Sequence, residues 1–307
     1  MSTIIREVRI PASTSNLGPG FDCFGLALKL YLTVRATAMP GVAEQCRVTT
    51  TGAKENEALP RNAVNLIYRA MSFAALREGV ALPPVELLVH NEIPLASGLG
   101  SSAAAIVAGI KLGGLITGKQ ISDQTIQNYA TEFEGHPDNV AASLHGGFLV
   151  SCVCSDGTVI SAKFSWPAQV RVVVVSPHSQ LPTHVARAAL PRTVSRQDAV
   201  YNLQRTALFT AALAQQRYDL FWEAMHDRLH QPQRESLMPG LAEALALPRM
   251  PGLLGLALSG AGPSIVALVD DNEEAISARI ASCFQARRIE STVRTLDVDN
   301  DGGQVIS

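Results

Sequence analysis

The chain has few aromatic residues, little net charge and no cluster of like charges. Aromatic side chains make up 5% of its 307 residues, and the formal net charge at pH 7 is −2. The 25 lysine and arginine residues are scattered, so we expect no dense positive face of the kind that attracts nucleic acid or an anionic membrane. With 47% hydrophobic residues, the chain can bury the cores of two ordinary domains. These features favour a globular protein that acts on small molecules, without nucleic acid or membrane as a partner.

Cysteine is also scarce, and long apolar runs are missing. The five cysteines are odd in number and lack paired metal-type spacing apart from Cys152 and Cys154, so we expect reduced thiols in the core. The longest apolar stretch, residues 103–117, contains Lys111 and is shorter than the ~20 residues of a membrane span; it predicts a buried helix. The first residues lack the basic start and apolar run of a secretory signal, so we expect a cytoplasmic protein.

Hydrophobic periodicity predicts helices and strands that mix without strict alternation. The expected helices are residues 63–78, 102–116, 120–134, 196–216, 219–230 and 273–288. The expected strands are residues 8–10, 26–36, 85–89, 170–175, 253–258, 265–269 and 291–297, with residues 142–153 as a strand or buried segment. Residues 11–21 are dense in Gly, Pro, Ser and Asn and are expected to form a loop. This order predicts an α+β fold with domains 1–160 and 161–307, joined near residues 155–168.

A glycine-serine segment lies between an expected strand and an alanine-rich helix. Residues 94–104 read Pro-Leu-Ala-Ser-Gly-Leu-Gly-Ser-Ser-Ala-Ala. Gly98 and Gly100 lack Cβ and let the backbone approach a phosphate, while Ser101 and Ser102 offer hydroxyl donors or a magnesium ligand. The helix that follows directs its N-terminal N–H groups and dipole at the anion. Because phosphoryl transfer needs its oxygens held and their charge offset, the segment predicts a phosphate-binding loop.

Other interpretations of this segment exist. Glycine-rich turns also precede helices merely for tight packing. Residues 98–103 fit the dinucleotide pattern G-x-G-x-x-A, but the preceding strand alternates polar and apolar residues, whereas a central parallel strand would be continuously apolar. Residues 113–119 match G-x-x-x-x-G-K, yet Gln120 replaces the required Ser or Thr. The phosphate and packing interpretations remain open.

Two further blocks accompany the loop. Residues 11–22 read Pro-Ala-Ser-Thr-Ser-Asn-Leu-Gly-Pro-Gly-Phe-Asp, and residues 258–264 read Leu-Ser-Gly-Ala-Gly-Pro-Ser. With these blocks, the chain resembles the GHMP group of small-molecule kinases from about residue 6 to residue 296. The first block, together with Glu-Gly-His-Pro-Asp-Asn at residues 134–139, is similar to the branch of the group that acts on homoserine.

The resemblance implies a fold and a reaction. The N-terminal domain would have the α+β fold of the group, like domain 2 of ribosomal protein S5, and the C-terminal domain would be ferredoxin-like. The reaction would convert ATP and L-homoserine into ADP and O-phospho-L-homoserine, a step toward threonine. Mg²⁺ is the implied metal ion, and a homodimer is the implied assembly.

Matching the group's motifs also implies the binding residues. ATP would be bound by Asn65, Pro94, Leu95, Ala96, Ser97, Gly98, Leu99, Gly100, Ser101, Ser102, Ala103 and Ala104. The acceptor would be bound by Asn16, Asp22, His136, Asp138, Asn139, Thr183, Arg187, Arg234 and Gly260. In that set, Asn16 and Asp22 would hold the ammonium group, and Arg187 and Arg234 the carboxylate. Asn139 would face the reacting hydroxyl, and it and Arg187 are the expected catalytic residues.

Each assignment has a plainer alternative. Asn16 and Asp22 flank a Gly-Pro-Gly turn and are suited to shaping it. The two arginines lie in polar surroundings, where single arginines are usually solvated. Residues 138–139 are suited to capping a helix over 140–144, and residues 66–67 are equally well read as core or as part of an adenine slot.

The expected chemistry leaves two points open. Asparagine cannot accept a proton as a general base, so Asn139 suggests catalysis by positioning, magnesium and the helix dipole. Magnesium is expected to bind Ser102 and a glutamate before His136, and Glu132 is preferred because Glu134 adjoins the break at Gly135.

Other activities fit the sequence less well. Kinases of the group that act on mevalonate, a sugar or shikimate have substrates without an ammonium group. A binding or regulatory protein that has lost catalysis would not need the intact loop. A Rossmann-type oxidoreductase is the weakest alternative.

Overall fold

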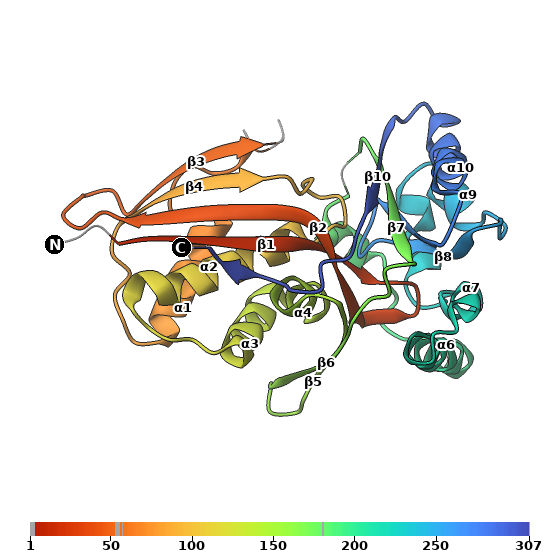
Figure 1. Ribbon diagram of the computed structural model, residues 1–307, viewed down its shortest axis with the longest axis horizontal. Coiled ribbons are helices and arrows are strands. Elements are labelled where there is room, and N and C mark those ends of the chain that lie inside the picture. Colours follow the sequence, from red (N-terminus) through yellow and green to blue (C-terminus); the bar gives the residue numbers. More distant parts are fainter. Residues whose placement is uncertain (1–3, 53–55, 57, 180, 307) are drawn as a thin grey trace.

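A computed structural model describes residues 4–52, 56, 58–179 and 181–306, and its strands form two sheets (Figure 1). The first sheet has the order β11-β1-β2-β4-β3, with β5 paired to β2 and β6 to β5; the second has the order β10-β7-β9-β8. The strands of the first sheet are β1 (Ile5–Asn16), β2 (Gly20–Ala38), β3 (Cys46–Gly52), β4 (Val85–Asn91), β5 (Phe148–Val153), β6 (Val159–Phe164) and β11 (Gln304–Val305). Those of the second are β7 (Arg171–Pro177), β8 (Leu253–Leu258), β9 (Ile265–Val269) and β10 (Ser291–Leu296).

The helices lie in two groups. The first group covers one face of the first sheet and consists of α1 (Leu66–Arg77), α2 (Ser101–Thr117), α3 (Asp123–Glu134) and α4 (Asp138–His145) (Figure 1). The second group accompanies the second sheet and consists of α5 (Thr183–Ala188), α6 (Arg196–Ala214), the 3-10 turn η2 (Tyr218–Leu220), α7 (Phe221–Ala224), α8 (Gln231–Arg234), the 3-10 turn η3 (Glu235–Leu237), α9 (Leu241–Leu245) and α10 (Glu273–Gln285). From β7 through the α5–α9 helices, β8, β9 and α10 to β10, the second part follows the β-α-β-β-α-β order of a ferredoxin-like unit. The expected α+β fold is confirmed.

The first motif block is strand rather than loop, so the expectation of a loop over residues 11–21 was wrong. β1 continues to Asn16 and pairs with β2 through register shifts at Pro11/Ala12 and Ser15/Asn16. Only a short turn, Leu17-Gly18-Pro19, separates the two strands. The polar residues that suggested a loop are buried in the sheet, and their hydroxyl groups bond to residues distant in sequence.

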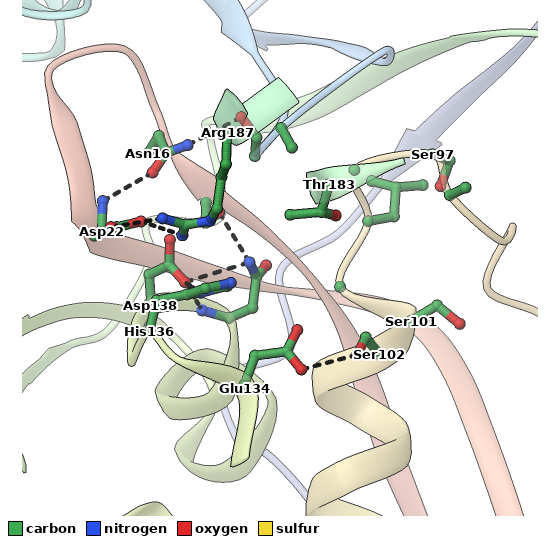
Figure 2. A pocket seen from close by; sticks show the side chains of 18 of the residues that line it. Asn16, Asp22, Ser97, Ser101, Ser102, Glu134, His136, Asp138, Thr183 and Arg187 are labelled. Carbon is green, nitrogen blue, oxygen red and sulfur yellow. Dashed lines mark hydrogen bonds and ion pairs between the residues drawn. The ribbon is translucent and has the colours of Figure 1, made fainter. Parts of the chain in front are cut away.

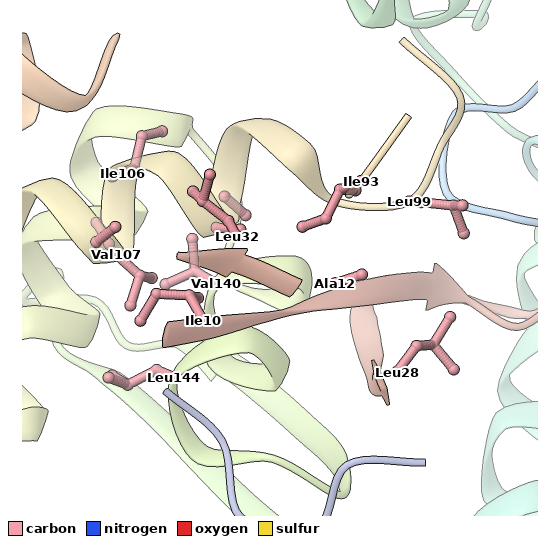
Figure 3. Packing of buried hydrophobic residues seen from close by; sticks show 14 of the residues in the cluster. Ile10, Ala12, Leu28, Leu32, Ile93, Leu99, Ile106, Val107, Val140 and Leu144 are labelled. Atoms are coloured by element: carbon pink, nitrogen blue, oxygen red, sulfur yellow. The ribbon is translucent and has the colours of Figure 1, made fainter. Parts of the chain in front are cut away.

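Helix α2 is the buried helix expected from residues 103–117. Gly109 and Gly113 let it approach α1, because a Cβ on either would lie 2.4 Å from the Ile67 carbonyl oxygen or 2.9 Å from that of Met71. Figure 3 shows Ile106 and Val107 of this helix packed against Ile10 of β1 and Leu32 of β2. Burial of this apolar face stabilises the helix by about 25 cal/mol for each Å² of apolar surface that is removed from water. Within the described ranges, no helix combines the length and hydropathy that crossing a membrane requires.

Several other expectations need correction. Residues 142–153 are not one segment but the end of α4 followed by β5, separated by Gly146 and Gly147 at positive φ. The expected helix at 219–230 ends at Ala224. Cysteines are free as expected, but Cys152 is exposed and only Cys46 is buried, because β5 and β6 form a hairpin with a solvated face.

The two sheets meet along the N-terminal hairpin. After β10 the chain returns to the first sheet, where the Lys29 N–H donates to the Asp297 carbonyl oxygen and β11 pairs with β1. The division at residue 160 stays a prediction; β6 still belongs to the first sheet. The β1–β2 turn reaches the second group of helices, and this junction positions the site described next.

Candidate active site

The glycine-serine loop connects β4 to α2 in a left-handed backbone conformation at several positions. Ala96, Gly98 and Gly100 have φ values of 50°, 82° and 69°. Gly100 is the N-cap residue of α2, and no side chain caps the N–H groups of this helix start. These N–H groups and the positive end of the helix dipole are therefore suited to an anion.

The two glycines also allow close packing. A Cβ on Gly98 would lie 2.2 Å from the Ser259 carbonyl oxygen, and one on Gly100 would lie 2.1 Å from Ser13 Oγ. The Ser259 hydroxyl donates to the Gly98 carbonyl oxygen at 2.7 Å. The packing interpretation of this loop therefore holds, and it does not compete with anion binding, because the same contacts fix the loop's backbone.

An apolar pocket of about 840 Å³ lies on one side of the loop. Its lining residues are Leu32, Leu59, Pro60, Val64, Asn65, Leu66, Ile67, Val89, Asn91, Leu95, Ala96, Ser101, Ser102 and Ala105. Asn65 is the N-cap of α1, with its Oδ1 accepting from the Ile67 N–H at 3.0 Å. Ile67 is also buried in the main core, so residues 66–67 serve as core and as pocket wall. A flat apolar group fits between these walls.

A charged pocket of about 660 Å³ lies on the other side of the loop. It brings together Asn16, Asp22, His136, Asp138, Asn139, Thr183, Arg187, Arg234 and Gly260, which is the whole expected acceptor set. From the loop it is lined by Pro94 and by residues 96–102. Figure 2 shows that β1, β2, α4 and α5 bring side chains together near the start of α2, namely Asn16, Asp22, Asp138, Thr183 and Arg187. The two pockets share Ala96, Ser101 and Ser102.

Asp22, which is expected to bind the ammonium group, and Arg187, which is expected to bind the carboxylate, form an ion pair with each other. Arg187 Nη2 and Nη1 donate to the two oxygens of Asp22 at 2.7 and 3.1 Å, a two-pronged ion pair (Figure 2). Asp22 has φ 54°, held by its N–H donating to Asn16 Oδ1 at 3.1 Å. Asn16 therefore shapes this turn, as its plainer interpretation proposed. It places the Asp22 carboxylate in the pocket.

Arg234 is not a solvated surface residue. It is 1% exposed, and its Nη1 donates to the Gly260 carbonyl oxygen at 3.1 Å. Burial, followed by the nearby charge of Arg187, lowers the pKa of Arg234 to about 10. A carboxylate in the pocket would offset this unfavourable burial of charge.

His136 and Asp138 form a buried pair beside Asp22. His136 Nδ1 donates to Asp138 Oδ1 at 2.6 Å. Burial lowers the pKa of His136, but the hydrogen bond and charge of Asp138 outweigh it, so the pKa of His136 is raised. Burial raises the pKa of Asp138, but the bond and charge of His136 outweigh it, so the pKa of Asp138 is lowered. The carboxylates of Asp22 and Asp138 and the His136 ring place ligand atoms within 4.8 Å of one another.

Asn139 is held by serines of the first motif block. Ser13 Oγ donates to its Oδ1 at 3.0 Å, and its Nδ2 donates to Ser15 Oγ at 2.9 Å. Its N–H donates to Asp138 Oδ1 at 2.6 Å, in the first turn of α4. The helix expected over residues 140–144 is confirmed, but residues 138–139 lie inside it and its N-cap residue is Pro137, so the capping interpretation was wrong.

The structure corrects the preference for Glu132. Glu132 lies on the far face of α3, where its carboxylate pairs with Arg77 of α1 at 2.7 Å. Glu134 is the last residue of α3 and accepts from Ser102 Oγ at 2.8 Å (Figure 2). The Gly135 break, at φ 93°, turns the chain so that Glu134 faces the loop. The preference failed because residues two apart on a helix point to opposite faces.

Ala103 and Ala104 are fully buried in the core and line neither pocket, and their assignment to ATP stays a prediction. Conversely, the charged pocket is also lined by Ser15, Phe21, Glu134 and Ala261, which were not expected. All four lie inside the motif blocks at 11–22, 134–139 and 258–264, so position within those blocks was the available signal.

Comparisons with known proteins agree with this arrangement. Family models match the chain as the GHMP kinases N terminal domain over residues 65–147 and the GHMP kinases C terminal domain over residues 209–285. The chain is 41% identical to the homoserine kinase of Solibacter usitatus over 279 residues, which is 91% of this chain and 90% of that protein. It is 40% identical to the homoserine kinase of Desulfitobacterium hafniense over 301 residues, 98% of this chain and 99% of that protein.

A solved structure is similar over the same length. The homoserine kinase from Cytophaga hutchinsonii matches with a TM-score of 0.86 and 28% identity, covering 99% of this chain and 98% of that one. The similarity therefore includes both sheets and the junction that holds the two pockets.

Proposed function

The chain belongs to the GHMP kinases, and we propose that it transfers the terminal phosphoryl group of ATP to the side-chain hydroxyl of L-homoserine. Homoserine kinase activity is supported by the homoserine kinases of Solibacter usitatus and Desulfitobacterium hafniense, which match 91% and 98% of the chain at 41% and 40% identity. The products are ADP and O-phospho-L-homoserine. The cytoplasmic location and the homodimer stay predictions.

One observation carries the proposal: an apolar pocket and a charged pocket meet at a single anion-binding loop. Ala96, Ser101 and Ser102 line both pockets. A nucleotide with its base in the apolar pocket would place its phosphates at the start of α2, and an acceptor in the charged pocket would face the terminal phosphate from the other side. This is the arrangement that in-line phosphoryl transfer needs.

Magnesium fits the residues near the loop. Ser102 Oγ and Glu134 Oε2 are 2.8 Å apart, and both are the hard oxygen ligands that Mg²⁺ prefers, with phosphate oxygens supplying the remainder. When bound, magnesium offsets the negative charge of the phosphoryl oxygens. Within this chain, Ser102 and Glu134 would hold it.

The acceptor's two charges match the paired side chains. Homoserine carries an ammonium group and a carboxylate, and we assign these to Asp22 and to Arg187 with Arg234. The Asp22–Arg187 pair would then be exchanged for two ion pairs with the substrate. This exchange keeps every buried charge partnered, and it disfavours acceptors with only one charge.

Catalysis rests on positioning rather than on a general base. Asn139 Oδ1 accepts from Ser13 and can accept one further hydrogen bond, from the acceptor hydroxyl, but an amide does not take the proton. The hydroxyl proton then leaves to a phosphoryl oxygen or to solvent. Orientation by Asn139 and charge stabilisation at the helix start suit a loose transition state.

The test is ADP release with a panel of acceptors. Purified protein, ATP and Mg²⁺ are combined with homoserine, mevalonate, galactose or shikimate at equal concentration. We expect turnover with homoserine alone. Turnover with another member of the panel and none with homoserine would refute the substrate and retain the kinase; no acceptor-dependent turnover would refute both.

A further inference from the structure

His230 lies behind the charged pocket without lining it. Its side chain is fully buried, with Nε2 2.7 Å from the Gly18 carbonyl oxygen and Nδ1 3.0 Å from Arg234 Nη1. Gly18 belongs to the turn between β1 and β2, and that turn carries Asn16 and Asp22. One imidazole ring therefore joins the hairpin of the ammonium ligands to an arginine of the carboxylate site.

The partners define the protonation state of this ring. A carbonyl oxygen only accepts and a guanidinium only donates, so Nε2 carries the hydrogen and Nδ1 offers a lone pair. His230 is therefore a neutral imidazole. Burial, together with the charge of Arg234, lowers the pKa of His230 more than the Asp227 carboxylate raises it, which agrees with this state.

The backbone of His230 is itself fixed by a buried carboxylate. Asp227 Oδ2 accepts from the backbone N–H groups of His230 and Gln231 at 2.9 and 2.7 Å. Asn202 Nδ2 donates to Asp227 Oδ1 at 2.6 Å and to the Pro19 carbonyl oxygen at 3.3 Å. The hairpin turn is thus bonded at two consecutive carbonyl groups by one connected set of side chains.

The same contacts leave part of Arg234 for a ligand. Its Nε donates to the Ala186 carbonyl oxygen at 3.3 Å, and Nη1 donates to His230 and to the Gly260 carbonyl oxygen. In the part of the chain that the structure describes, Nη2 donates to no acceptor. The rings of Phe21 and His230 stack with 5.3 Å between their centroids. The guanidinium groups of Arg187 and Arg234 lie 5.7 and 5.6 Å from the centroid of the Phe21 ring.

We propose that His230 is a positioning residue that sets the distance between the ammonium-binding hairpin and the carboxylate-binding Arg234. The inference rests on the proposed function, because a zwitterionic acceptor is what makes that distance matter. A rigid, neutral ring bonded at both nitrogens holds the two charged ligands in one geometry, as the supporting residues of a precise site do.

Three substitutions separate the two hydrogen bonds. His230→Ala removes both. His230→Asn keeps an oxygen near the Nδ1 position that accepts from Arg234, and His230→Gln keeps an amide N–H that reaches toward the Gly18 carbonyl. We expect His230→Ala to raise the KM for homoserine roughly ten- to a hundredfold, with the KM for ATP within about twofold of the wild type. The Asn and Gln variants should each show a smaller rise.

His226→Ala is the matched control, since His226 is exposed, packs edge-on against Trp222 and bonds to Glu223. It should leave both KM values unchanged. Equal changes in the two KM values after His230→Ala, or none, would overturn the inference. If His230→Ala does not fold, wild-type KM for homoserine in both the Asn and Gln variants would overturn it. Absence of homoserine turnover in the wild type would instead refute the proposed function.

Discussion

The two halves of the site are built in different ways. The proposed phosphate-binding half is one contiguous segment, residues 94–102, whose left-handed glycines and helix start are local features. The acceptor half is assembled from segments as distant as Asn16 and Gly260, and its charged side chains bond to one another or to backbone carbonyl groups. In the proposed function, the first half would bind charge with the backbone, and the second would bind it with side chains.

This difference predicts that substitutions in the two halves will have different effects on ligand binding and folding. A backbone site fails when the chain path changes, and then binding and folding suffer together. A side-chain site loses affinity for one ligand when one group is removed, while the fold and the other ligand are unaffected. The substitutions below test this contrast, beginning with the largest expected effect.

Gly98→Ala should disrupt the loop. Its Cβ would lie 2.2 Å from the Ser259 carbonyl oxygen, at a φ of 82° that L-residues rarely adopt. We expect turnover to fall by about a hundredfold or more and the free energy of unfolding to fall by ~1–3 kcal/mol. ADP release and thermal unfolding measure the two effects.

Gly118→Ala is the control for Gly98→Ala. It has a similar φ of 73°, but no atom lies within 4 Å of the added Cβ. It should lower stability by about 1 kcal/mol and leave turnover unchanged. Wild-type turnover in Gly98→Ala would contradict a phosphate site built from this backbone.

Asp22→Asn should affect only the acceptor half. The substitution removes the charge that pairs with Arg187 and with the substrate's ammonium group, so we expect the KM for homoserine to rise roughly ten- to a hundredfold. The KM for ATP should stay within about twofold. Steady-state kinetics with each substrate varied in turn gives both values.

Asp219→Asn is the control for Asp22→Asn, because it disrupts a different aspartate–arginine ion pair. Asp219 binds Arg217 through two hydrogen bonds of 2.9 and 2.8 Å on the protein surface, and neither residue lines either pocket. It should change neither KM, because exposed pairs contribute little. If Asp22→Asn raised the KM for ATP as much as the KM for homoserine, the division of the site into two halves would be wrong.

Glu134→Gln and Glu132→Gln test the point where the halves meet. Glu134 bonds to Ser102, whereas Glu132 bonds to Arg77 on another helix. We expect Glu134→Gln to raise the magnesium concentration for half-maximal turnover about tenfold, and Glu132→Gln to leave it unchanged. Equal responses of the two variants in a magnesium titration would refute the assignment.

The smallest effect concerns pH and the His136–Asp138 pair. The raised pKa of His136 means that its charged form stabilises the fold fully below its ordinary value of 6.5, and this contribution is lost as pH rises through the raised value. The lowered pKa of Asp138 means that its contribution is present above its ordinary value of 3.8 and is lost as pH falls through the lowered value.

The pair should therefore stabilise the fold most between these two ordinary values. We expect His136→Asn to lower the Tm more at about pH 5 than at about pH 9. His90→Asn, at an exposed position on β4, is the control. A Tm difference that is the same at both pH values would contradict the buried ion pair.

The sequence predicted most elements and the acceptor set that lines the charged pocket, but only part of the lining of the apolar pocket. Helix α2 and the loop before it were predictable because their periodicity, glycines and serines lie within one short window. Strands β1 and β2 were misjudged at residues 11–21, because serine, threonine and asparagine are typical of loops in water. Here, they are buried and bond to Asn139 and Ser259, partners that no local pattern reveals.

The glutamate assignment failed for a related reason. Glu132 and Glu134 have the same chemistry, and only the packing of α3 between α1 and the loop decides which faces the nucleotide. The alternative interpretation of Arg234 as a solvated surface residue was wrong, because its burial depends on Ala186, His230 and Gly260 from other segments.

The sequence by itself determined the anion-binding loop, since a left-handed glycine and a helix start are properties of neighbouring residues. It also determined which residue types serve a zwitterionic acceptor. Only the tertiary structure decided how those charges are paired, which glutamate faces Ser102 and that His230 connects the two ends of the pocket. The physical reason is distance along the chain: groups separated by more than a hundred residues take their relative positions from the packing of the two sheets.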